Sequence, residues 1–205
     1  MGLDITDIEQ LPSPDAPIEP VFDYWVGEDV DASIVIDASG HLYVAIEQER
    51  FNDRGLEVGQ LIKLDPSRPD DPLVWSLAVP PRGGGDGGLW ATPALGAGSS
   101  AGMLYAATHP GEILAVDTAT GEVTWRDEIE WHAWSSPIVV DGVLVVGVDC
   151  STGGGLRAYD LADPRRPTER WDLPLEGGCI ESSPIMWDGR IYVGSRDGFF
   201  YAFGD

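Results

Sequence analysis

A sequence motif that contains proline recurs along this chain at a nearly constant interval, and it constrains the fold more than any other feature. The clearest copies begin at Ala91-Thr92-Pro93, Ser135-Ser136-Pro137 and Ser182-Ser183-Pro184, so that their prolines are spaced by 44 and 47 residues. After each proline come an apolar strand, a glycine-containing turn and a second apolar strand. A period of this length is typical of propeller blades, in which each repeat forms one small antiparallel sheet.

The pattern within each repeat predicts strands throughout. Apolar runs of four to six residues alternate with Gly and Asp turns, which is the periodicity of strands, and no helix is expected. The fold class is therefore all-β: a β-propeller of four-stranded antiparallel blades, with about four blades in this chain or half of an eight-bladed ring. The expected blades cover about 33–75, 90–125, 134–171 and 181–205.

The last repeat is one strand short of the others. Residues 21–26, Val-Phe-Asp-Tyr-Trp-Val, precede the first blade and resemble a spare strand. Because open sheet edges invite unwanted pairing, we expect this segment to close the last blade as its outer strand. Residues 1–20, which are rich in Pro and acidic side chains, are expected to be a disordered lead-in to a repeat domain over 21–205.

Composition narrows the classes of partner. The formal net charge is −23, with 35 acidic residues against 12 basic ones. Such a surface repels phosphate, so neither nucleic acid nor an anionic membrane is an expected partner. The acidity fits either a saline habitat or a codon bias against lysine. No apolar stretch approaches the roughly 20 residues of a membrane helix, and no secretory signal is recognised. As written, the chain is expected to be cytoplasmic, or else a fragment of a larger, exported protein.

One segment carries a specific family resemblance. Ala115-Val-Asp117-Thr-Ala-Thr-Gly121-Glu-Val-Thr-Trp125 resembles the docking motif of PQQ-type (quinoprotein-like) propeller repeats, Ala-x-Asp-x-x-Thr-Gly-x-x-x-Trp. In that family the Trp lies between neighbouring blades. Partial copies run from Lys63 to Trp75 and from Ala158 to Trp171. The resemblance implies a structural docking role for Asp65, Trp75, Asp117, Gly121, Trp125, Asp160 and Trp171.

For function the resemblance points in two directions. The family includes PQQ-dependent dehydrogenases and non-enzymatic scaffolds of outer-membrane assembly. The dehydrogenases carry adjacent cysteines and an Asn among their calcium ligands, whereas here Cys150 and Cys179 are far apart and the sole Asn is Asn52. We therefore expect a non-catalytic scaffold without cofactor or metal that binds a protein or small ligand. The alternative is part of a PQQ- and calcium-dependent dehydrogenase that is complete only as a larger ring.

The strand order places two sets of loops on one face. The loop into each first strand and the loop between the second and third strands share a rim, where ligands commonly bind. The candidate ligand-binding residues on this rim are Trp90, His109, His132, Trp134, Glu181, Arg196 and Asp197. Plainer interpretations exist: the tryptophans would only pack, the histidines would be turn residues, and Glu181, which replaces Trp134 in the next repeat, would be a solvated acid.

Two further expectations concern covalent and subunit contacts. Cys150 and Cys179 lie in loops of adjacent blades, so a disulfide is geometrically allowed; export would favour it and the cytoplasm would keep both thiols reduced.

Four blades also leave room for four more, from a missing segment or from a second copy. In such a homodimer residues 21–26 would be exchanged to complete the partner's last blade.

Two other patterns lack the spacing of a known site. The run from Gly83 to Gly88 has no following Lys-Ser/Thr and is expected to be a flexible connection and not a phosphate loop. The acidic group of Glu47, Glu49 and Asp53 lacks the spacing of a calcium loop.

Overall fold

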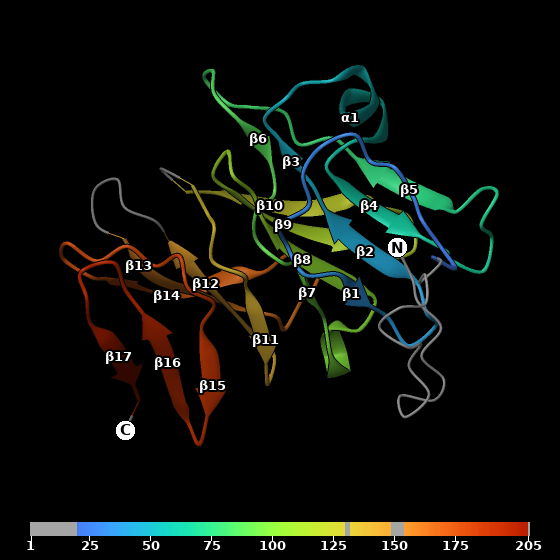
Figure 1. Ribbon diagram of the computed structural model, residues 1–205. Helices are drawn as coiled ribbons and strands as arrows, with labels where there is room; N and C mark the ends of the chain where they lie inside the picture. Colours follow the sequence, from blue (N-terminus) through green and yellow to red (C-terminus); the bar gives the residue numbers. More distant parts are fainter. Residues whose placement is uncertain (1–19, 130–131, 149–153, 205) are drawn as a thin grey trace, which may run out of the picture.

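Residues 20–129, 132–148 and 154–204 are described by the computed structural model, and they form the repeated antiparallel sheets that the sequence predicts. We call these sheets blades one to four. Within each blade the strands pair in chain order. The sheets follow one another through space, with blade one and blade four at opposite ends (Figure 1).

The strands have the following bounds. Blade one consists of β1 (Val35–Ile36), β2 (Leu42–Ala45), β4 (Leu61–Leu64) and β5 (Leu73–Leu77). Blade two consists of β7 (Ala94–Leu95), β8 (Met103–Ala107), β9 (Glu112–Asp117) and β10 (Val123–Glu128). Blade three consists of β11 (Ile138–Val140), β12 (Val143–Val148), β13 (Gly155–Asp160) and β14 (Thr168–Pro174). Blade four consists of β15 (Ile185–Trp187), β16 (Arg190–Gly194) and β17 (Phe200–Phe203), and a short ladder joins β3 (Glu47–Gln48) to β6 (Gly87–Gly88).

Asp-Gly pairs form the tight turns after the first strands of blades three and four. Asp141 and Gly142 have φ angles of 48° and 75°, and Asp188 and Gly189 have 49° and 72°. Positive φ at both central residues matches the right-handed twist of the two flanking strands, and Asp-Gly adopts it readily. These turns fix the register of each hairpin, and with it which side chains face the neighbouring blade.

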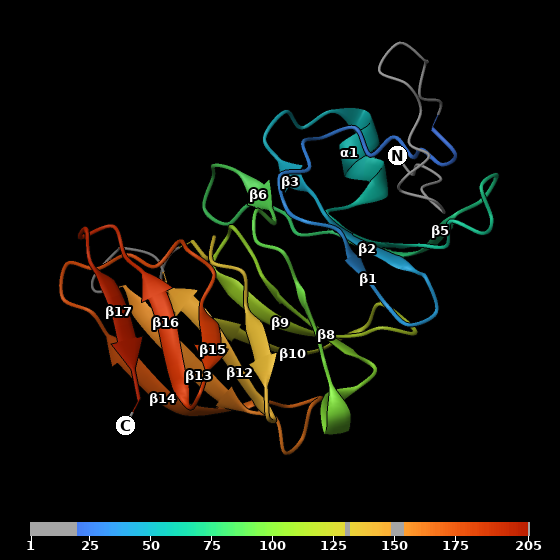
Figure 2. The same cartoon turned by 60° about the horizontal axis from the view of Figure 1, so that its bottom comes forward.

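The sheets of neighbouring blades follow one another from blade one to blade four in Figure 2. Apolar side chains fill the space between them. Every second residue of a strand points to the same face, so a sheet that lies between two others contributes one row of side chains to each neighbour. The central members of these layers are Tyr43, Leu61, Leu104 and Leu114 between blades one and two, Tyr105, Ile113, Leu144 and Tyr159 between two and three, and Val145, Leu156, Ile191 and Val193 between three and four.

The docking motif lies where the resemblance implies. The indole of Trp75 rests on Gly121 of the next blade, where an added Cβ would lie 2.8 Å from the ring, and its Nε1 donates to the carbonyl of Thr118 at 3.0 Å. Asp117 accepts from the backbone N–H of Ala119 at 2.9 Å and holds this turn.

The partial motifs share some of these contacts. Asp65 and Asp160 accept from backbone N–H groups two residues ahead, at 3.0 and 2.8 Å. Trp125 packs edge-on against Tyr159 with ring centroids 5.2 Å apart, and Trp171 packs on the apolar layer between blades three and four.

Two short helices depart from the all-strand expectation. Helix α1 (Asp53–Val58) follows Asn52, whose side chain caps it by accepting from the N–H of Gly55 at 2.8 Å. A 3-10 turn, η2 (Gly98–Ser100), lies in the first hairpin of blade two. The capping Asn and the buried Val58 explain why a polar loop became helical, because a satisfied N-terminus and one apolar anchor stabilise a short helix.

Blade four has three strands in the described residues, and segment 21–26 does not close it within the chain. Phe22, Tyr24 and Val26 instead pack on an apolar cluster at the outward face of blade one. The expectation of closure was therefore wrong for a single copy, because the two end blades lie apart. Of the expected lead-in, residues 1–19 lie outside the described residues.

Candidate functional site

Four predicted rim residues come together at one place. Trp90 and Trp134 precede the first strands of blades two and three, and His109 follows β8. Because the first two strands of a blade are antiparallel, the residue before one and the residue after the other lie at the same end of the sheet. His132 lies two residues before Trp134 and joins the same group. The structure thus places Trp90, His109, His132 and Trp134 in one contiguous group of rings.

Ring stacking is the main contact within this group. The centroids of His109 and His132 are 4.0 Å apart with the planes at 18°, and those of His132 and Trp134 are 5.4 Å apart at 10°. Trp90 closes the group, with its centroid 3.9 Å from that of His109 and 4.7 Å from that of Trp134. Offset and tilted arrangements of this kind are the favourable ones for aromatic pairs.

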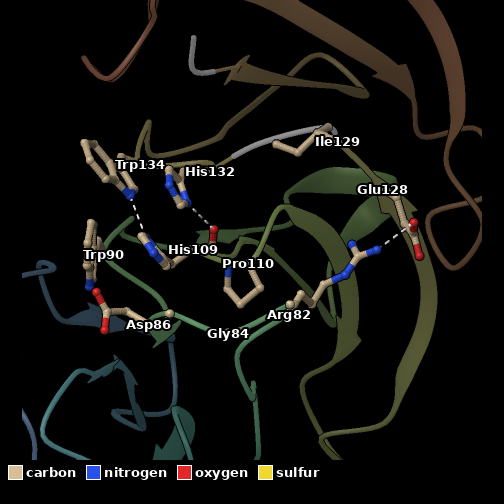
Figure 3. A pocket seen from close by; sticks show the side chains of 12 residues that line it. Arg82, Gly84, Asp86, Trp90, His109, Pro110, Glu128, Ile129, His132 and Trp134 are labelled. Atoms are coloured by element: carbon tan, nitrogen blue, oxygen red, sulfur yellow. Dashed lines mark hydrogen bonds and ion pairs between the residues drawn. The ribbon is translucent and has the colours of Figure 1, made fainter. Parts of the chain in front are cut away.

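Two hydrogen bonds lock the rings in place (Figure 3). The indole N–H of Trp134 donates to Nδ1 of His109 at 2.8 Å. Nδ1 of His132 lies 2.9 Å from the backbone carbonyl of His109. Since a carbonyl only accepts, Nδ1 of His132 is the donor in that bond. Since an indole only donates, Nδ1 of His109 is an acceptor, and the hydrogen of neutral His109 resides on Nε2.

His109 is held neutral near pH 7. Burial lowers the pKa of His109 to about 4, and the neighbouring His132 adds to the effect, while Asp86 acts in the opposite direction. The side chain is 5% exposed, so its charged form would lose most of its hydration. His109 is therefore a rigid, uncharged wall of the site, with one N–H to offer.

The ring group lines a cavity of about 980 Å³, which we call the aromatic cavity. Its other walls come from the Gly83–Gly85 loop, Pro110, Ile129 and the ion pair between Arg82 and Glu128, whose Nη2 and Oε2 are 2.8 Å apart (Figure 3). Among the described residues, no Ser, Thr, Cys, Tyr or Lys lines it. The chemistry on offer is therefore aromatic stacking and hydrogen bonding, without a hydroxyl, thiol or amine nucleophile.

One donor of the cavity wall is unused. Nε1 of Trp90 is buried and has no acceptor among the described residues. In Figure 3 the indole nitrogen of Trp90 points toward Asp86. A buried donor without an acceptor costs on the order of 1–3 kcal/mol, so an acceptor brought by a ligand would recover free energy here.

A smaller acidic hollow of about 310 Å³ shares two walls with the aromatic cavity. Trp90 and Trp134 line it together with Asp31, Glu47 and Glu49. Burial raises the pKa of Glu47 to about 7, and the charges of Asp31, Glu49 and Asp29 raise it further. Sequence reasoning missed Asp31 as a rim residue. The signal was present, since Asp31 holds in the first repeat the place of Trp90, Trp134 and Glu181.

The remaining predicted rim residues lie apart from the aromatic cavity, in blade four. Nη1 of Arg196 forms an ion pair with Oε1 of Glu181 at 2.7 Å, so that Glu181 is a paired acid. Asp197 accepts from the hydroxyl of Tyr201 at 2.7 Å and from the N–H of Phe199 at 2.9 Å. The hydroxyl of Tyr201 is the main cause that lowers the pKa of Asp197. These contacts organise a turn; the structure does not bring the three residues to the aromatic rings.

Cys179 takes no part in the aromatic cavity. Cys179 is disulfide-bonded, and the only other cysteine of the sequence, Cys150, lies outside the described residues. Within the described part, no group of three or more His, Cys, Asp or Glu side chains is arranged to hold a metal ion. No helix there has the length and apolar character needed to cross a bilayer.

Comparison with known proteins identifies the repeats. A family model of PQQ-type repeats, described as outer membrane protein assembly factor BamB, matches residues 58–167. The assembly factor BamB of Nitrosomonas eutropha is 30% identical over 146 residues, which are 71% of this chain and 30% of that protein. This chain thus spans less than a third of that relative's length.

Solved structures share the fold. BamB from Moraxella catarrhalis matches 90% of this chain and 49% of its own, with a TM-score of 0.63 and 18% identity. Quinohemoprotein alcohol dehydrogenase from Comamonas testosteroni matches 82% of this chain and 29% of its own, with a TM-score of 0.56 and 16% identity. At these identities the likeness concerns architecture alone.

Proposed function

The chain belongs to the family of PQQ-type repeats described as outer membrane protein assembly factor BamB, and from that membership we propose that it is a non-catalytic propeller scaffold that binds a protein partner at the aromatic cavity. One observation carries this proposal: His109, His132 and Trp134 are stacked and held by two hydrogen bonds, Trp90 is tilted against them, and no described residue of the cavity wall has a hydroxyl, thiol or amine side chain. Preorganised aromatic walls bind ligands at low entropic cost.

The ligand that fits these walls is a segment of polypeptide. The cavity offers flat apolar faces and two N–H donors, those of His109 and of the buried Trp90. In a bound peptide, backbone carbonyls would accept from these donors and an adjacent apolar side chain would pack on the rings. The name of the related assembly factor supports a protein ligand, since that protein is described by its part in an assembly. A second copy of this chain is a further partner that we propose, because the chain spans about half of a similar propeller.

Peptide selection tests the proposal. Peptides enriched from a displayed library on the intact protein should bind Trp134→Ala and Trp90→Ala at least tenfold more weakly. Leu56→Ala is the control, because it removes an apolar side chain that is 53% exposed and lies outside the cavity. Equal binding by all variants, or no enriched peptide, would contradict a role for the cavity.

The alternative is a quinoprotein dehydrogenase completed in a larger ring. The residues present do not fit that group: the cysteines are not adjacent, and Asn52 caps helix α1 and is not in a calcium site. A titration with PQQ and Ca²⁺, followed by absorbance and dye reduction, discriminates the two. Stoichiometric quinone uptake would replace the scaffold proposal.

A further inference from the structure

Blade four ends in an uncovered apolar sheet face. Its inward residues Ile191 and Val193 are 8% and 1% exposed, whereas Ile185, Trp187 and Phe200, on the opposite face, are 61%, 75% and 71% exposed. Neighbouring large side chains gather there as well, since Tyr192 stacks on Phe200 with centroids 6.2 Å apart. An antiparallel sheet tolerates one wet face when that face is polar. The outward face of blade four is apolar, and large exposed apolar patches commonly mark interaction surfaces.

The edge of the same blade is also open. β17 pairs with β16 on one side, and no described strand pairs with its other side, whereas blades one to three have four strands each. Unpaired N–H and C=O groups along such an edge are a template for one more strand.

The other end of the molecule carries a candidate strand. In segment 21–26 burial alternates, with Phe22, Tyr24 and Val26 packed on blade one and Val21 and Trp25 exposed by 63% and 72%. Arg54 fastens the segment by donating to the carbonyl of Trp25 at 3.2 Å and to the hydroxyl of Tyr24 at 3.1 Å. Segment 21–26 thus alternates like a strand and is held on blade one, and the side chains of Val21 and Trp25 face outward.

The contacts between blades follow a rule that stops at blade four. The residue four places before the proline of each repeat donates its N–H to a carbonyl at the end of the second strand of the preceding blade. These bonds run from Leu89 to Ile46 at 2.9 Å, from Ala133 to Thr108 at 3.3 Å and from Ile180 to Val148 at 3.3 Å. The next acceptor in this series is the carbonyl of Ser195. The corresponding donor is Val30, in the repeat position of Leu89.

The acceptor side is already shaped for this contact. The carbonyl of Thr108 accepts from Gly111 at 3.0 Å in its own turn as well as from Ala133. The carbonyl of Ser195 accepts from Gly198 at 3.2 Å in the equivalent turn. A carbonyl oxygen has two lone pairs, so the second bond fits the same geometry in blade four.

We infer that the outward face of blade four docks on the blade-one end of a second copy of this chain, and that the reciprocal contact closes an eight-bladed ring with two-fold symmetry. Segment 21–26 of each copy then lies beside β17 of the other and serves as its fourth strand. The interface continues the blade-to-blade packing that the chain already uses three times. It deepens the partner binding proposed above without involving the aromatic cavity.

Charge supports this pairing locally and opposes it globally. Arg196 holds in blade four the place of His109, and the ring that His109 meets across its blade boundary, Trp134, corresponds to Asp31 in blade one. Arg196 therefore faces Asp31 of the second copy. Each copy carries a formal charge of −23, so the two halves repel at low ionic strength. Salt screens that repulsion, and association should strengthen as salt is added.

Light scattering after size exclusion tests the inference. In about 0.5 M NaCl, where the Debye length is only a few ångströms, the protein should have twice the chain mass of 22.1 kDa. Combined Trp187→Asp and Phe200→Asp substitutions should return it to one chain mass with an unchanged far-UV circular dichroism spectrum. Thr168→Asp, on the exposed outer strand of blade three, is the control and should remain dimeric.

Each outcome decides the matter. A wild-type monomer, an open polymer, or a dimer that survives the double substitution would overturn the ring. Should the double variant misfold, Trp187→Gln at its 75% exposed site should still weaken the dimer at least tenfold. Trp134→Ala should leave the dimer intact, so failure of the ring and failure of the cavity proposal are separate results.

Discussion

The indole N–H of Trp134 donates to Nδ1 of His109 at 2.8 Å, and this bond crosses the boundary between blades two and three. It joins two residues 25 positions apart in the chain. The bond selects one tautomer of His109 and disfavours its protonation, because a protonated Nδ1 would have to donate. The candidate site is therefore rigid before any ligand arrives.

Removing that bond should change how His109 titrates. In the wild type burial is the main reason that the pKa of His109 lies at about 4. Trp134→Phe keeps a ring in place but removes the donor, so the pKa of His109 should rise, while the remaining burial still holds it below 6.5. Imidazole ¹⁵N chemical shifts measured against pH provide the readout. A wild-type His109 that titrates near 6.5 would refute the assignment.

His109 should also make the fold sensitive to acid. Its folded pKa is depressed, so the unfolded chain binds the proton more tightly between pH 6.5 and about 4. Stability should fall as the pH drops through this window, by up to about 3 kcal/mol at about 1.4 kcal/mol per pKa unit. Denaturant titrations of His109→Gln, which stays neutral, should show a flatter profile than the wild type. Parallel profiles would contradict this role.

Glu47 should act in the opposite direction. Burial raises the pKa of Glu47 to about 7, so the folded state holds its proton where the unfolded state has lost it. Stability from this group is present below about pH 4.5 and declines as the pH rises toward 7. Glu47→Gln should therefore stabilise the protein at pH 8 by on the order of 1–3 kcal/mol and have little effect at pH 4. Equal effects at both pH values would exclude the titration as the cause.

Gly121 should tolerate no side chain. Gly121→Ala places a Cβ 2.8 Å from the ring of Trp75 at a φ of 75°. Gly142→Ala is a matched control, because Gly142 has the same φ of 75° and open space around it. Both variants pay backbone strain of about 1 kcal/mol. Gly121→Ala should lose at least about 2 kcal/mol more in thermal unfolding, from lost docking. Equal losses of stability in the two variants would show that the ring of Trp75 moves aside without a cost in free energy.

The thiol content should reveal the bond at Cys179. Cys179 is disulfide-bonded, so the oxidised protein should contain no titratable thiol when it is denatured without reductant. Treatment with reductant before denaturation should release two, since the sequence has two cysteines. Two free thiols in protein purified under oxidising conditions would contradict the bond. A link between loops distant in sequence stabilises by restricting the unfolded chain.

The repeat and its turns were readable from the sequence because their causes are local. Asp-Gly pairs between two short apolar strands, such as Asp188-Gly189, favour positive φ at both residues. The alternation of apolar residues predicts which face of a strand is buried. The docking role of Trp75 and Gly121 was what the family resemblance implied, and the structure brings these two residues into contact. Family membership and the all-β class were confirmed on these grounds.

Other features depend on contacts between distant residues. Helix α1 formed because Asn52 and Val58 found partners in the fold, and segment 21–26 packed on blade one because Phe22, Tyr24 and Val26 met an apolar cluster there. No local sequence pattern predicts which of two distant sheets a segment will pack against.

The sequence by itself therefore determined the blade, its turns and its number of repeats. Only the tertiary structure decided that Trp90, His109, His132 and Trp134 share one cavity while Glu181 and Arg196 pair elsewhere. The physical reason is that periodicity specifies which side of a strand faces a neighbour, whereas ring stacking and ion pairing depend on how far each blade turns relative to the next. That rotation arises from packing between whole sheets.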